Sequence, residues 1–90
     1  MTILYKIVVT KDFKKDVKKI RQYPSLYNNL KKIVDGLKEN PYAPPHEKLI
    51  MPVPMFSKRL NIQHRLVYTI SEDKKGVKLL SCWGHYVNIG

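Results

Sequence analysis

The chain has 90 residues, 43% hydrophobic and 27% charged, a composition that fits one soluble globular domain over residues 1–90 and excludes a disordered or fibrous protein. Seventeen lysines and arginines oppose seven aspartates and glutamates, so the formal net charge is +10. This excess predicts a polyanionic partner such as nucleic acid, or an anionic membrane surface. A membrane-spanning helix is excluded, because no segment reaches about 18 consecutive apolar residues.

The first predicted elements are a strand over residues 2–9 and a helix after it. The odd-numbered residues from position 3 to 9 are all apolar or aromatic, the pattern of a strand with one buried face. The helix begins after a cap at Thr10 or Asp12, and its apolar residues recur at spacings of four and three: Phe13, Val17 and Ile20. Its lysines turn mostly away from that face and form either a solvated surface or an RNA-contacting one: Lys14, Lys15, Lys18 and Lys19.

A second helix is predicted between two prolines. Pro24 is expected to end the first helix, and Ser25 can then cap the second. Leucines and other apolar residues repeat at helical spacing up to Asn40, where Pro41 disfavours a helical conformation in the residue before it. The segment NPYAPPHEK, residues 40–48, is rich in proline and is expected to form a short ordered loop.

The rest of the chain is predicted to form strands. Four segments combine apolar alternation with flanking turn residues: Glu47–Met51, Phe56–Ile62, Arg65–Ile70 and Val77–Trp83. The order strand, helix, helix and four strands predicts an α+β domain, with a twisted, mostly antiparallel sheet that carries two helices on one face. The other face would be open and basic, and we expect the functional site there.

Polar residues of the strand region have the chemistry that RNA cleavage requires. The 2′-hydroxyl must lose a proton to attack the adjacent phosphorus, the phosphorane carries extra negative charge, and the departing 5′-oxygen needs a proton. Glu47 is ionised at neutral pH and available as a base, Arg59 and Arg65 can grip phosphate with two hydrogen bonds each, and His85 can be held protonated by a nearby phosphate. Taken singly, each residue also fits a solvated surface position.

Metal and cofactor sites are not indicated. The three histidines and the single cysteine lack short paired-ligand spacing, and there is no glycine-rich phosphate loop, so we expect neither a metal nor a cofactor. One cysteine, Cys82, cannot form an internal disulfide and fits a reducing cytoplasm. Lys6 interrupts the apolar N-terminal segment and no small-residue cleavage site follows, which argues against a secretory signal.

The stretch HEKLIMPVPMFSKRLNIQHRLVYTI, residues 46–70, followed by CWGHY, residues 82–86, resembles the YoeB/Txe toxins of the RelE/ParE superfamily. Similarity extends over nearly the whole chain. It implies a bacterial type II toxin, an endoribonuclease that enters the ribosomal A site and cleaves translated mRNA. By this resemblance Glu47 would be the general base, Arg59 and Arg65 the cations at the phosphate, His85 the general acid and Tyr86 an orienting or stacking partner.

Two features depart from the family pattern. Relatives commonly carry a lysine where this chain has Ile50, so a cation would come from Lys48, from Lys58 or from elsewhere in the chain. Relatives also tend to end at the tyrosine, whereas residues 87–90 continue here. His64 is expected to shape the turn that places Arg65.

The resemblance also implies partners. These are an acidic, partly disordered antitoxin, the ribosome with its mRNA, and operator DNA only through the antitoxin complex; whether two copies of the chain form a dimer is left open. No membrane partner is expected, and the protein would act in the bacterial cytoplasm at the ribosome. Two alternatives remain: a ParE-like toxin that inhibits gyrase without cutting, against which the full Glu, Arg and His set argues, and a non-catalytic nucleic-acid-binding module.

Overall fold

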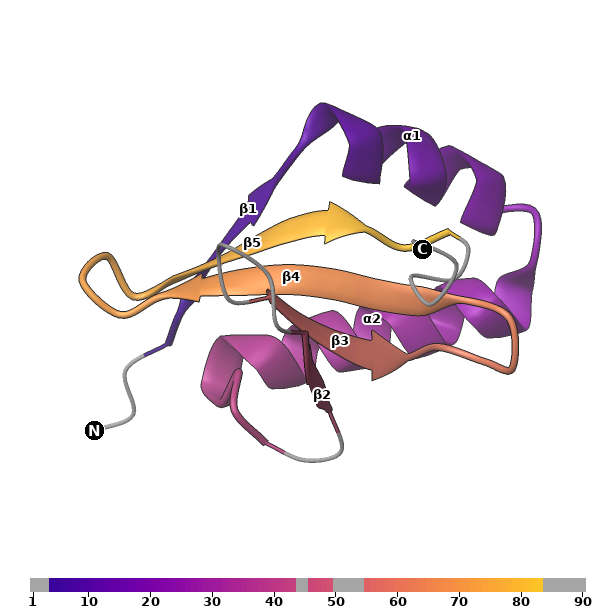
Figure 1. Ribbon diagram of the computed structural model, residues 1–90. Coiled ribbons are helices and arrows are strands. Elements are labelled where there is room, and N and C mark those ends of the chain that lie inside the picture. Colours follow the sequence, from indigo (N-terminus) through magenta and orange to yellow (C-terminus); the bar gives the residue numbers. More distant parts are fainter. Residues whose placement is uncertain (1–3, 44–45, 50–54, 84–90) are drawn as a thin grey trace.

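The computed structural model describes residues 4–43, 46–49 and 55–83. Along these residues one strand is followed by two helices and then by strands only (Figure 1). The elements are β1 (Lys6–Val9), α1 (Lys11–Ile20), α2 (Pro24–Glu39), β2 (Glu47–Leu49), β3 (Met55–Arg59), β4 (Arg65–Ser71) and β5 (Gly76–Ser81). The predicted α+β class and the predicted order of elements are therefore confirmed.

The strands of the described residues form one five-stranded sheet in the order β1-β5-β4-β3-β2. Neighbouring strands from β2 to β5 run antiparallel, whereas β1 lies parallel to β5. The first strand thus pairs with the last, although both helices and strands β2 to β4 separate them in the sequence (Figure 1). A mostly antiparallel sheet was predicted, and it is confirmed.

Both helices pack against the same face of the sheet. The apolar stripe of each helix meets alternate residues of β4 and β5, because side chains of a strand point to opposite faces in turn. The core contains Phe13 and Ile20 from α1, Leu26, Leu30 and Leu37 from α2, and Leu66, Tyr68, Val77 and Leu79 from the sheet. Neither helix in the described residues is long and apolar enough to cross a membrane.

The junction between the helices differs from the prediction. The first helix ends at Ile20, with Arg21 at its C-cap, and Pro24 is the first residue of α2 rather than a stop signal. Proline suits this position because the first helical N–H has no partner within the helix. Tyr23 is the N-cap, so the prediction that Ser25 caps α2 was wrong.

The start of α1 follows the prediction. Thr10 is the N-cap, and its Oγ1 accepts a hydrogen bond from the Phe13 N–H at 3.2 Å. The same hydroxyl donates to the Leu79 carbonyl oxygen at 3.0 Å. One threonine therefore caps the helix and ties it to β5.

Strand ends move by a few residues, and the largest difference lies after β3. A strand was predicted to run to Ile62, but it ends at Arg59 and the chain turns over residues 60–64. The carbonyl of His64 accepts the N–H of Leu60 at 2.9 Å, and the His64 N–H donates to the Asn61 side chain at 2.7 Å. The predicted part of His64 in this turn is confirmed. Residues 2–3 and 50–51, predicted to lie in strands, are outside the described residues.

Candidate functional site

The register of β2, β3 and β4 places several sequence-predicted positions on one face of the sheet. Glu47 pairs with Ser57, and Arg59 pairs with Arg65. Residues directly opposite each other share a face, as do positions two apart along a strand. Leu66, next to Arg65, belongs to the core under the helices. Positions 47, 57, 59 and 65 therefore lie on the face opposite α1 and α2, here called the outer face.

The two arginines form the cationic centre of the outer face. Arg59 is exposed, Arg65 is half-buried, and they stand directly opposite each other at the ends of β3 and β4. Guanidinium groups bind phosphate with two parallel hydrogen bonds each. The role of the two arginines at an RNA phosphate stays a prediction.

Lys48 and Lys58, proposed to replace the lysine that relatives carry at position 50, do not lie on the outer face. Lys58 pairs with Leu66 and Lys48 with Phe56, so both positions belong to the helix side. The Lys58 ammonium donates to the carbonyl oxygen of Ala43 at 2.7 Å, and burial lowers its pKa. Lys58 therefore has a structural contact with the loop before β2. That Lys48 and Lys58 bind RNA stays a prediction.

Ser57 is a residue of the outer face that the sequence reasoning did not single out. Its side chain is 1% exposed, and its Oγ has no hydrogen-bond partner in the part of the molecule that the structure describes. Leaving a buried hydroxyl unpaired costs on the order of 1–3 kcal/mol. The Ser57 hydroxyl lies on the same face of β3 as Arg59, so it is a candidate for a hydrogen bond that holds a bound group next to the arginines. The sequence signal was a serine between an aromatic residue and two basic ones.

Two predicted site residues, His85 and Tyr86, lie outside the described residues, as do Ile50 and residues 87–90. The role of His85 as general acid and that of Tyr86 as its partner therefore stay predictions.

Cysteine chemistry does not belong to this site. Cys82 is fully buried, and its backbone N–H donates to the Asp16 carboxylate at 3.1 Å. Burial, with the nearby Asp16 charge, raises the pKa of the thiol to about 12. The reactive form of cysteine is the thiolate, so this thiol is inert at neutral pH. Among the described residues, no three His, Cys, Asp or Glu side chains come together as a potential metal site.

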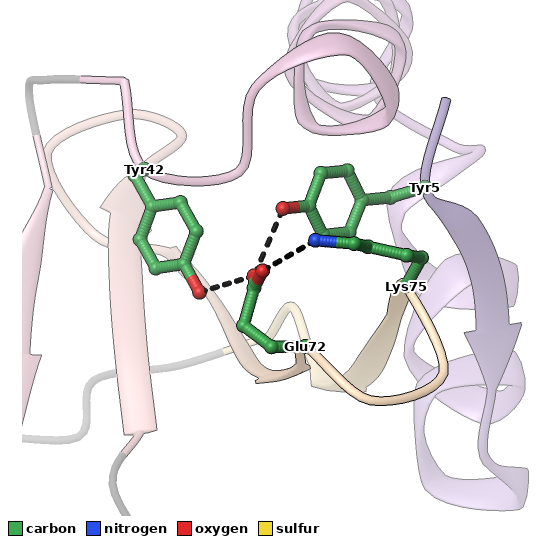
Figure 2. Close-up of polar contacts among 4 residues, drawn as sticks. All are labelled: Tyr5, Tyr42, Glu72 and Lys75. Carbon is green, nitrogen blue, oxygen red and sulfur yellow. Dashed lines mark hydrogen bonds and ion pairs between the residues drawn. The ribbon is translucent and has the colours of Figure 1, made fainter. Parts of the chain in front are cut away.

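A polar cluster lies at the other end of β4, around Glu72 (Figure 2). Its carboxylate accepts hydrogen bonds from Lys75 at 2.7 Å, from the Tyr5 hydroxyl at 2.8 Å and from the Tyr42 hydroxyl. The donors come from the residue before β1, from the loop before β2 and from the β4–β5 hairpin. The cluster therefore joins three segments that are distant in sequence and holds the loop that leads to Glu47.

Glu72→Gln is expected to lower the melting temperature at pH 7 and to have a much smaller effect near pH 2. Hydrogen bonds from Lys75, Tyr42 and Tyr5 lower the pKa of Glu72 from 4.5 to about 2 in the folded chain. A lowered folded-state pKa stabilises the fold fully above the unfolded-state value, and this stabilisation is lost as the pH falls towards the folded-state value. The effect is small because the carboxylate is exposed to solvent.

The measurement is the difference in melting temperature between parent and variant from pH 7 to pH 2. Asp73→Asn, in the same hairpin, is the control, and its difference should not follow this curve. A Glu72→Gln difference that stays constant between pH 5 and pH 2 would show that the cluster does not hold the carboxylate ionised.

The order of elements and the five-stranded sheet with a parallel β1–β5 pair define a RelE-like α+β domain, and its outer face carries the arginine pair. No family model and no curated protein matches the sequence. Solved structures do match.

A YoeB/ParE toxin from Agrobacterium tumefaciens is similar with a TM-score of 0.81 and 22% identity, over 90% of this chain and 99% of that chain. The YoeB dimer from Staphylococcus aureus gives a TM-score of 0.77 and 25% identity, over 91% of this chain and 98% of that one. A chain of the Escherichia coli DinJ–YafQ complex gives a TM-score of 0.79 and 20% identity, over 96% of this chain and 99% of that one. The structure therefore has the fold of the YoeB, RelE and ParE toxins, and the resemblance seen in the sequence is confirmed at the level of structure.

Proposed function

We propose that this chain is the toxin of a type II toxin–antitoxin system and a ribosome-dependent endoribonuclease that cleaves translated mRNA in the A site. The observation that carries the proposal is the Arg59–Arg65 pair, which shares the outer face with position 47. A net charge of +10 and the toxin fold support it.

The proposed reaction is transfer of a phosphodiester to the neighbouring 2′-hydroxyl. Glu47 accepts the hydroxyl proton, the 2′-oxygen attacks phosphorus, and the bond to the 5′-oxygen breaks as His85 donates a proton to that oxygen. Arg59 and Arg65 stabilise the negative charge that develops on the phosphorane, and Tyr86 orients the reacting groups. The products are a 2′,3′-cyclic phosphate and a 5′-hydroxyl.

The test is analysis of the product ends after incubation with programmed ribosomes. We expect a 2′,3′-cyclic phosphate and a 5′-hydroxyl, because side chains supply every proton transfer. Glu47→Gln should stop cleavage while the affinity for RNA changes little. Products with a 5′-phosphate and a 3′-hydroxyl would contradict the mechanism, since they require attack by water, usually with a metal. Growth arrest without any cleavage would favour a ParE-like toxin instead.

The proposed protein partner is an acidic antitoxin. The similar YoeB of Staphylococcus aureus is known in a complex with YefM and as a dimer. A disordered acidic segment with apolar anchors would meet the basic surface quickly, and burial of the anchors would hold it there. The complex, rather than the toxin alone, would contact operator DNA. The free toxin would act in the cytoplasm, on ribosomes.

A further inference from the structure

A cavity of about 410 Å³ lies between the start of α2 and the turn at residues 60–64. It is separate from the Glu72 cluster and from the arginine pair. Aromatic rings and amide side chains make up most of its wall: Tyr23, His64, Trp83, Asn29, Asn61 and Gln63.

The aromatic rings of the cavity form a stack. The Trp83 ring lies 4.1 Å from the His64 ring with an interplanar angle of 21°, and 5.9 Å from the Tyr23 ring with an angle of 27°. Tyr23 is 52% exposed, so much of its ring is open to solvent. The Lys19 ammonium lies 5.9 Å from the centre of the Trp83 ring. The cavity therefore offers an aromatic surface and a nearby cation.

Two asparagines of the cavity are held in fixed orientations. The Asn29 amino group donates to the Leu60 carbonyl oxygen at 3.2 Å. The Asn61 Oδ1 accepts the N–H groups of Gln63 and His64 at 2.9 and 2.7 Å. These bonds use the amino group of Asn29 and the oxygen of Asn61. The Asn29 oxygen and the Asn61 amino group can therefore present an acceptor and a donor to a ligand.

The cavity is next to the proposed reaction site along the chain. His64, in its wall, directly precedes Arg65, the first residue of β4. The cavity is on the helix side, because Leu26 and Asn29 of α2 line it, so a single-stranded RNA with a phosphate at the arginine pair would reach it around the turn at residues 60–64. One unstacked base could turn into the cavity.

We propose that this cavity binds a nucleobase of single-stranded RNA beside the cleaved bond. The inference rests on the proposed function for the identity of the substrate. Proteins recognise unpaired bases by stacking on aromatic rings and by hydrogen bonds to base edges, and amide side chains carry the donor and acceptor that such edges require. Bound in this way, the base positions the RNA and gives the toxin a base preference.

Trp83 gives a direct measurement, because it is the only tryptophan of the chain. The probe is a short, fully 2′-O-methylated single-stranded oligonucleotide, which lacks the hydroxyl that attacks in cleavage. We expect its binding to change the Trp83 fluorescence. In a set of oligonucleotides that each lack the base at a different position, the oligonucleotide without the bound base should no longer change the Trp83 fluorescence.

Two variants test the wall of the cavity. Tyr23→Ala should weaken binding about 10-fold, in line with the usual loss of a base–aromatic stack. Tyr23→Phe keeps the aromatic ring and is the matched control, so it should bind as the parent does. Asn29→Ala should weaken binding more than Asn28→Ala, its neighbour on α2, which does not line the cavity.

The outcomes separate the two proposals. Binding that is detected by the anisotropy of a labelled oligonucleotide, but with unchanged Trp83 fluorescence and no loss in Tyr23→Ala and Asn29→Ala, would overturn the base site and leave the nuclease proposal intact. Absence of any binding, together with absence of cleavage on ribosomes, would overturn both.

Discussion

Arg65→Ala is expected to lower the rate of RNA cleavage by on the order of 100-fold or more, because in the proposed mechanism Arg65 stabilises charge that develops in the transition state. Arg65 stands opposite Arg59 in the register of β3 and β4, so the variant leaves one arginine at this pair of positions. The loss should appear mainly in kcat. The measurement is single-turnover cleavage on programmed ribosomes, with folding checked by circular dichroism.

Lys15→Ala is the matched control for loss of one positive charge. Lys15 lies exposed on α1, away from the arginine pair, so it can steer RNA but cannot contact the reacting phosphate. We expect nearly unchanged kcat, with weaker RNA affinity and a shallower dependence of affinity on salt. Equal losses of kcat in the two variants would remove Arg65 from the reaction site.

Ile20→Ala is expected to lower the free energy of unfolding by about 2–5 kcal/mol, a large part of the stability of a small domain. Ile20 is fully buried at the end of α1 and belongs to the core between the helices and the sheet. The truncation removes buried methyl groups and leaves a cavity that a chain of this size can refill only in part. Urea denaturation at constant m-value measures the change.

Ile62→Ala is the matched control, because it makes the same substitution at a side chain that is 86% exposed. We expect a change within about 0.5 kcal/mol. Similar losses in both variants would mean that the apolar stripe of α1 does not form the core. The contrast also tests the strand boundary, since a strand that continued to Ile62 would have packed this residue.

Local patterns predicted the elements well but their junctions less well. The spacing of Phe13, Val17 and Ile20 indicates a helix, because residues three and four positions apart lie on the same helical face and can be buried together. Proline is ambiguous, since it can follow one helix and begin the next, and at Pro24 the second use applies. The segment 60–64 contains alternating apolar residues, yet the hydrogen bonds between its ends turn the chain.

The candidate site divides in the same way. The residue types that suit phosphate binding were evident from the sequence, but their arrangement depended on register. A shift of one residue between β3 and β4 would move Arg59 to the helix side, where Lys58 now lies, because successive residues of a strand point to opposite faces. Two partners of Glu72, Tyr5 and Tyr42, are 67 and 30 residues away from it, and no local pattern links them to it.

The sequence by itself therefore determined the composition of the domain, its basic charge, the order of its elements and the kinds of side chain available for chemistry, because these depend on residue identity and short spacing. Only the tertiary structure decided that β1 lies parallel to β5, that Arg59 stands opposite Arg65, and that Tyr23, Trp83 and His64 line one cavity. These are contacts between distant segments, and their geometry is set by how the two helices and the sheet pack around a shared core.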